Sequence, residues 1–188
     1  MADFFGTVEH GFFLFAITTT LVGYYAYFFL SHSALMKRLF SRHFSGDNFW
    51  LRWVLFQKAT GFIFMAFFPA LLYLFFFTGK LTDFGLSLHH LQVNWKWFVF
   101  FLIFFILLNS FLARKTGLME QYPQMRICSW SKRHFLLSIF GWIIYLLAYE
   151  YLFRGLLLFS AYEAFGVWPA IAINVALYSA VHFPKGMG

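Results

Sequence analysis

The chain has 188 residues, of which 62% are hydrophobic and 26% aromatic, while only 11% carry a charge. Ordinary soluble domains carry about 25% charged residues, so the composition excludes such a domain and indicates a membrane protein. The net charge of +7 does not indicate nucleic-acid binding, because the Lys and Arg residues lie between long apolar runs. At this length we expect one transmembrane domain, residues 1–188.

The first apolar run predicts a membrane-spanning helix. Gly11 to Leu30 is 20 residues without a charge, which is enough to cross about 30 Å of hydrocarbon. Ser31 to Phe44 then mixes basic residues with Leu, Met and Phe. This pattern is typical of a short interfacial helix lying on the membrane surface, and a solvated loop is the alternative.

The second and third spans follow from the next two runs. After a break at Ser45–Asn48 the second span continues to Phe77, and its uncharged part is Ala59 to Thr78. Pro69 predicts a kink, whereas Arg52 and Lys58 are expected to snorkel to the lipid headgroups.

Gly79 to Asn94 is predicted as a loop, and Trp95 to Ala113 as the third span. Arg114 to His134 is predicted as a basic loop. The fourth span is Phe135 to Phe165, and after a turn at Gly166 a fifth segment extends to about Phe183. The sequence therefore predicts an all-α polytopic membrane protein with about five transmembrane helices and one short interfacial helix.

The distribution of basic residues predicts the orientation. Ser31 to Lys58 holds five Lys and Arg residues and Arg114 to His134 another five, whereas Gly79 to Lys96 holds two and the residues before Gly11 none. Five alternating spans put the two rich loops on one side. We therefore expect a multi-pass protein of the bacterial cytoplasmic membrane, with its N-terminus outside and its C-terminus in the cytoplasm.

Ionisable residues inside the fourth segment indicate a functional site. Charges within a membrane span are costly and are by default functional. Glu150 and Arg154 are four residues apart and share a helix face, as do Tyr178 and His182 on the next segment. If the two segments form an antiparallel hairpin, Glu150 is level with His182 and Arg154 with Tyr178. We expect one buried polar cluster.

Two chemistries suit this cluster, and a structural role is the alternative. Glu150 and His182 could activate a water for attack on a carbonyl, with Arg154 keeping the carboxylate ionised. The same two residues could instead supply ligands to a divalent metal such as zinc, which would need at least one more ligand. Alternatively, Glu150 and Arg154 form a structural ion pair and His182 is an interfacial residue.

The stretch Tyr149-Glu150-Tyr151-Leu152-Phe153-Arg154-Gly155, followed by Tyr178-Ser179-Ala180-Val181-His182, resembles a known family. This is the CPBP family of intramembrane proteases, which contains CAAX prenyl proteases and bacteriocin-processing or self-immunity (Abi-type) proteins. Its motifs are Glu-Glu-x-x-x-Arg, then Phe-x-x-x-His, then His-x-x-x-Asn on a later helix. Leu81 to Leu86 also resembles the family's lead-in, so the resemblance covers residues 80–188.

The chain departs from the family pattern at two places. Tyr149 stands where the family has its first Glu, the residue that the resemblance would make the activator of water. A phenol, with an ordinary pKa of about 10, cannot take a proton from water at neutral pH. The third motif is not present, since the sequence ends six residues after His182.

The resemblance implies an endopeptidase that hydrolyses membrane-associated peptides with a water activated by Glu150 and His182. Arg154 would orient Glu150. The alternative is an inactive relative that serves as a structural subunit of a larger membrane complex, with lipid or pigment on its aromatic faces. The lipid bilayer is the expected environment in both cases, and nucleic acid is not an expected partner.

Overall fold

The computed structural model describes residues 8–77, 80–84, 89–112 and 124–182. Every regular element in these ranges is a helix, and they contain no strand. The elements in chain order are α1 (Val8–His32), α2 (Ala34–His43), α3 (Gly46–Phe62), the π-helix η1 (Ile63–Phe67), α4 (Phe68–Phe76), the 3₁₀-helix η2 (Leu81–Phe84), α5 (His89–Leu112), α7 (Lys132–Glu150), the π-helix η3 (Tyr151–Leu157), α8 (Leu158–Phe165) and α9 (Val167–Ala180).

Four helical stretches within the described residues are long and apolar enough to cross a membrane. They are Glu9–His32, Gly46–Phe76, Trp95–Leu112 and Lys132–Phe165, which confirms the predicted helical membrane fold. The fifth expected span corresponds to α9, a shorter apolar helix of 14 residues, or about 21 Å. The end expected for it, Phe183, lies outside the described residues, as do the residues before Val8 and residues 114–123 of the second basic loop.

Two segments between the spans form helices where a loop was either the alternative or the prediction. The basic segment after the first span forms α2, with the Ser33 side chain accepting a hydrogen bond from the Met36 amide and no residue of the helix buried. The helical alternative for this segment is therefore confirmed. The prediction of a loop over Gly79–Asn94 was wrong in part, because η2 lies within it and α5 begins at His89.

The distortion expected at Pro69 takes the form of the π-helix η1, which ends just before α4. Proline has no amide hydrogen and its ring excludes the usual helical bond to the carbonyl four residues earlier. A widened turn accommodates this mismatch without ending the helix. The long second span therefore continues through α3, η1 and α4 to Phe76.

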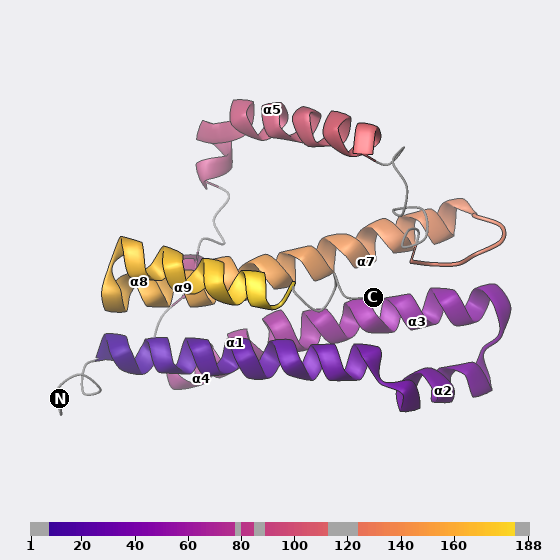
Figure 1. Ribbon diagram of the computed structural model, residues 1–188, viewed down its shortest axis with the longest axis horizontal. Coiled ribbons are helices and arrows are strands. Elements are labelled where there is room, and N and C mark those ends of the chain that lie inside the picture. Colours follow the sequence, from indigo (N-terminus) through magenta and orange to yellow (C-terminus); the bar gives the residue numbers. More distant parts are fainter. Residues whose placement is uncertain (1–7, 78–79, 85–88, 113–123, 183–188) are drawn as a thin grey trace.

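The helices other than α5 pack together. α3 packs along α7, α1 contacts α3 and α8, and α8 and α9 form a hairpin (Figure 1). The centre of the bundle holds fully buried side chains from three of the spans, among them Ala16, Met65, Leu152 and Phe153. α5 lies apart from these helices in Figure 1, and no residue of its Trp95–Leu112 stretch is buried.

The two basic loops meet at one end of the bundle, as the charge distribution predicts. The Asp47 carboxylate, in the first turn of α3, accepts a hydrogen bond of 3.0 Å from the Cys128 amide just before α7. Beside this bond, Val54 is buried with Met125 and Ile127. α3 and α7 therefore start at the same end, which we call the basic end.

Gly23 is the position where α1 depends most on the absence of a side chain. A Cβ atom there would collide with the backbone carbonyl oxygen of Phe64 in η1. Because backbone cannot move aside as a side chain can, we expect Gly23→Ala to destabilise the protein by about 1–3 kcal/mol, the usual cost of overpacking. The measurement is the free energy of unfolding in mixed micelles of detergent and denaturant.

Gly11 in the same helix provides the matched control. A Cβ atom there meets nothing within 4 Å, and Ala is a better helix former than Gly. Gly11→Ala should therefore leave the stability unchanged or raise it slightly. Equal stabilities of the two variants would contradict the close approach of α1 to η1.

Candidate functional site

The segment singled out in the sequence is built on a π-helix. Glu150 is the last residue of α7, and the seven residues after it form η3. π-helical turns are rare and occur frequently at functional sites. η3 is packed closely by η2, since a Cβ atom on Gly155 would lie 3.1 Å from the carbonyl oxygen of Phe84. η2, which is the described part of the Leu81–Leu86 segment, thus packs directly on η3.

The second arm of the hairpin is tied to η3 by a buried amide. Gly166 has a φ of 80° and turns the chain between α8 and α9. On α9, the buried Asn174 side chain donates a hydrogen bond to the carbonyl of Phe153. Within the hydrocarbon region such a backbone group has no water to bind, so this contact helps fix the register of α9 against η3.

Glu150 and Arg154 form an ion pair, with 3.1 Å between the Glu150 Oε2 and Arg154 Nε atoms. The guanidinium also lies 5.4 Å from the ring centre of Tyr178 on α9, as the predicted hairpin register requires. However, the side chains of Glu150 and Arg154 are 41% and 59% exposed. The expectation of one buried cluster was therefore wrong for this pair, which lies at the surface of the bundle.

Tyr149, rather than Glu150, is the motif residue in contact with His182. Its hydroxyl oxygen lies 3.4 Å from the Nδ1 atom of His182, and the residue is only 4% exposed. The side chains of adjacent helical residues point about 100° apart. Because Tyr149 faces α9, the Glu150 side chain points in a different direction. In the family that the sequence resembles, the first Glu of the motif stands at the position of Tyr149. In this chain the side chain that contacts the histidine from that position is therefore a phenol.

The hydrogen bonds of His182 define its tautomer. Nδ1 lies 2.7 Å from the carbonyl oxygen of Tyr178. A carbonyl can only accept, so Nδ1 carries the hydrogen in the neutral ring. Nε2 is then the nitrogen with a lone pair. It can accept a hydrogen bond from a water or bind a metal.

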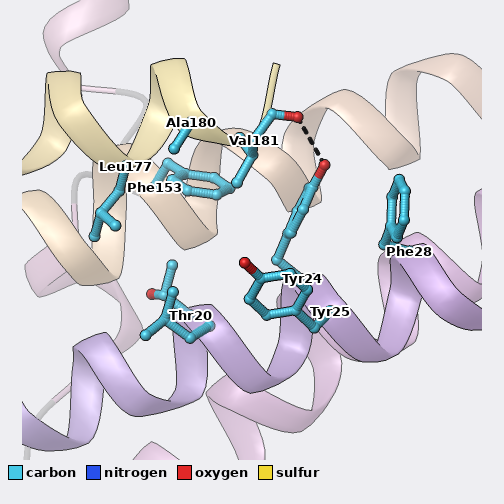
Figure 2. Close-up of a pocket in the computed structure, with 9 residues that line it drawn as sticks. Thr20, Tyr24, Tyr25, Phe28, Phe153, Leu177, Ala180 and Val181 are labelled. Atoms are coloured by element: carbon cyan, nitrogen blue, oxygen red, sulfur yellow. Dashed lines mark hydrogen bonds between the residues drawn. The ribbon is translucent and has the colours of Figure 1, made fainter. Parts of the chain in front are cut away.

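The last turn before His182 is held by α1. The Tyr24 hydroxyl donates a hydrogen bond of 2.9 Å to the carbonyl of Val181, which lies at the C-terminal end of α9 (Figure 2). The carbonyls in the last turn of a helix lack partners within the helix, and Tyr24 supplies one from a neighbouring span. Beside this bond a small crevice of about 80 Å³ separates α1 from Phe153 and Leu177.

Glu150 and His182 line the same cleft, which has a volume of about 490 Å³. Its walls come from α1, α3, α7 and α9, and their polar or aromatic residues include His32, Lys58, Trp142, Tyr149, Glu150 and His182. Of these six residues only Lys58 and Tyr149 are buried, but ionisable residues gathered between apolar spans are by default candidates for a functional role. The cleft is therefore the candidate functional site.

Lys58 is a member of this cleft that sequence reasoning missed. It was expected to snorkel to the headgroups, yet it is only 5% exposed. Its Nζ atom lies 3.3 Å from the ring centre of Trp142 and 4.4 Å from that of Tyr145. Trp142 and Tyr145 are eight and five positions before Glu150 on the same helix, but no single-sequence pattern pairs them with a lysine in another span.

The residues of the cleft do not make a complete metal site. A protein-bound zinc ion takes at least three protein ligands, and no group of three or more His, Cys, Asp and Glu residues occurs among the described residues. Glu150 and His182 are two candidates, and Glu150 is already paired with Arg154. The described donor set thus does not fit a metal, and no step below is assigned to one.

Comparisons with family models, with curated proteins and with solved structures find no match for this chain.

Proposed function

We propose that the chain is an intramembrane endopeptidase of the type that the CPBP-like motifs suggest. The observation that carries the proposal is the presence of Glu150 and His182 in one polar cleft formed by apolar helices. A carboxylate and an imidazole are the usual pair for holding and activating a water. The substrate class would be peptides at or near the membrane.

In the proposed reaction, Glu150 accepts a proton from water while the water oxygen attacks the carbonyl carbon of the peptide. His182 holds the water through Nε2, since Nδ1 is committed to the Tyr178 carbonyl. The proton on Glu150 then passes to the leaving nitrogen as the carbon–nitrogen bond breaks. Arg154 positions the Glu150 carboxylate through their ion pair. Its stacking distance to Tyr178 ties that pair to α9.

The orientation proposed with this activity puts the N-terminus outside and the basic end in the cytoplasm. The gathering of both basic loops at that end supports it, because cytoplasmic loops are enriched in Lys and Arg. The bacterial cytoplasmic membrane remains the proposed location. Peptides would then enter the cleft from the cytoplasmic half of the bilayer.

The proposal is tested with the purified protein in lipid nanodiscs and a membrane-associated fluorogenic peptide library. Cleavage should be lost in His182→Ala, by at least about 100-fold if the imidazole takes part in proton transfer. Absence of cleavage by the wild type, or an unchanged rate in this variant, would overturn the proposal.

His32 is a closely matched control for His182. Its Nδ1 also lies close to the carbonyl four residues earlier, at 2.9 Å from Phe28, and its ring also stacks on the aromatic residue at that position. Tyr178 takes that place for His182. We expect His32→Ala to retain most of the activity. An equal loss in both variants would attribute the effect to the shape of the cleft rather than to His182.

A non-catalytic membrane subunit is the second candidate, and the contact between Tyr149 and His182 favours it. With a phenol facing the histidine, the scaffold would serve to bind other helices. α5 has the exposed apolar surface for this purpose along its Trp95–Leu112 stretch. A monomeric protein that cleaves a model peptide would rule this candidate out.

A further inference from the structure

α5 stands apart from the bundle and carries two adjacent polar residues within its apolar span. No residue of its Trp95–Leu112 stretch is buried against the other described helices (Figure 1). Beyond Lys96 at the entry, the polar residues of this stretch are Asn109 and Ser110, and both are exposed. Asn109 lies about 4.5 Å along the helix from Leu112, inside the hydrocarbon layer, and its side chain is too short to reach the headgroups as that of a lysine does.

The side chain of Asn109 has hydrogen-bonding capacity that its own helix leaves unused. An amide has two N–H donors and a carbonyl oxygen that accepts. One donor binds the carbonyl of Phe105 at 2.8 Å, and the side chain makes no other hydrogen bond within the described part of the chain. The Ser110 hydroxyl, by contrast, donates its single hydrogen to the carbonyl of Ile106 at 2.7 Å. Because the hydrocarbon layer holds no water, Asn109 needs a polar partner from outside its own helix.

Asn109 selects one face of a helix that is apolar on every side. Lipid tails are as apolar as Leu, so apolar surface alone gives two helices little reason to pair, whereas a hydrogen bond between side chains does. The exposed residues that share a face with Asn109 follow one another at alternating steps of four and three residues, and with it they are Phe98, Leu102, Phe105, Asn109 and Leu112. This spacing is that of the seam in a parallel pair of helices, where a single Asn fixes the register.

A second copy of the chain supplies the complementary group at the required depth. Two copies inserted with the same orientation have α5 running in the same direction, so their Asn109 side chains lie at the same level of the membrane. An amide both donates and accepts, and two amides related by a two-fold axis along the membrane normal therefore satisfy each other. We propose that the chain forms a homodimer through α5, in which the two Asn109 side chains hydrogen-bond across this axis. The interface goes beyond the proposed peptidase activity and does not depend on it.

The test measures association of the full chain in liposomes. The single cysteine, Cys128, is exposed and lies outside α5, so it can carry a donor or an acceptor dye. Energy transfer between differently labelled copies is followed as the protein-to-lipid ratio rises. We expect the wild type to reach the plateau of a dimer, and Asn109→Leu to weaken association by about tenfold, within the range that a hydrogen bond between helices contributes in membranes. Asn109→Gln keeps the amide and should retain most of the association.

Ser110→Ala is the matched control, because it removes an adjacent polar group whose hydrogen is already bound within α5. This variant should associate as the wild type does. Disulfide formation with copper phenanthroline gives a second readout. In a Cys128→Ser background, Asn109→Cys should cross-link two copies faster than Ser110→Cys. A monomeric wild type, undiminished association of Asn109→Leu, an equal loss in Ser110→Ala, or cross-linking no faster at position 109 would each overturn the pairing.

Discussion

Replacing Tyr149 by Glu is expected to raise the rate of peptide hydrolysis by about 100-fold, within the range that a positioned general base contributes. The reason is the geometry of the hairpin, in which the Tyr149 hydroxyl lies 3.4 Å from His182 while Glu150 pairs with Arg154. A carboxylate at position 149 would lie beside the imidazole and supply a second proton acceptor for the water that Nε2 of His182 holds. The measurement is the initial rate of cleavage in nanodiscs.

Tyr149→Phe controls for changes in packing at this position. It keeps the ring contacts with Phe153 and Tyr178 and removes only the hydroxyl, so its rate should stay close to that of the wild type. If Tyr149→Glu folds, as judged by its melting temperature, and shows no gain, the water is not held at this position. A loss of activity in Tyr149→Phe would instead make the phenol part of the reaction.

The transmembrane architecture was predictable because it depends on run lengths and charge counts. Gly11–Leu30 is uncharged and Trp95–Ala113 carries only Lys96 near its start, so both were recognised from their apolar length; α1 contains the first run, and α5 contains the second as far as Leu112. The boundaries of loops were less predictable. His89–Asn94 belongs to α5, although its polar composition resembles that of a loop, because helix formation continues beyond the hydrocarbon layer.

The site was predictable to within one residue. Counting from the turn at Gly166 predicted that Arg154 is level with Tyr178, and their contact confirms this register. The same count predicted that Glu150 is level with His182, whereas in the structure Tyr149 is the residue in contact with His182. A count along the chain gives the level of a residue but not the direction of its side chain, and each helical residue rotates that direction by about 100°.

The burial of Lys58 could not be predicted from its own span. A lysine one residue before a long apolar run ordinarily extends to the headgroups. Here the rings of Trp142 and Tyr145, which belong to another span, hold the ammonium inside the cleft. Such a pairing depends on which helices pack together, and that information is not local in the sequence.

Glu150→Gln is expected to lower the rate of cleavage by about 1000-fold, because the amide cannot accept the proton of water. The substitution keeps the size of the side chain and an oxygen that can accept a hydrogen bond from Arg154. Binding of the peptide should therefore persist, and the loss should appear in kcat rather than in KM. The measurement is a set of cleavage rates at increasing peptide concentration in nanodiscs.

Glu163→Gln distinguishes a role in the reaction from a general effect of removing a carboxylate. Glu163 lies in α8, on the continuation of the same span, and is exposed. The Glu163 variant should cleave at the rate of the wild type. Arg154→Gln should fall between the two, because Arg154 positions the carboxylate without exchanging a proton. A Glu150 variant that retains the wild-type kcat would exclude Glu150 as the base, and the hydrolytic role of the cleft would then have no proton acceptor among the residues proposed.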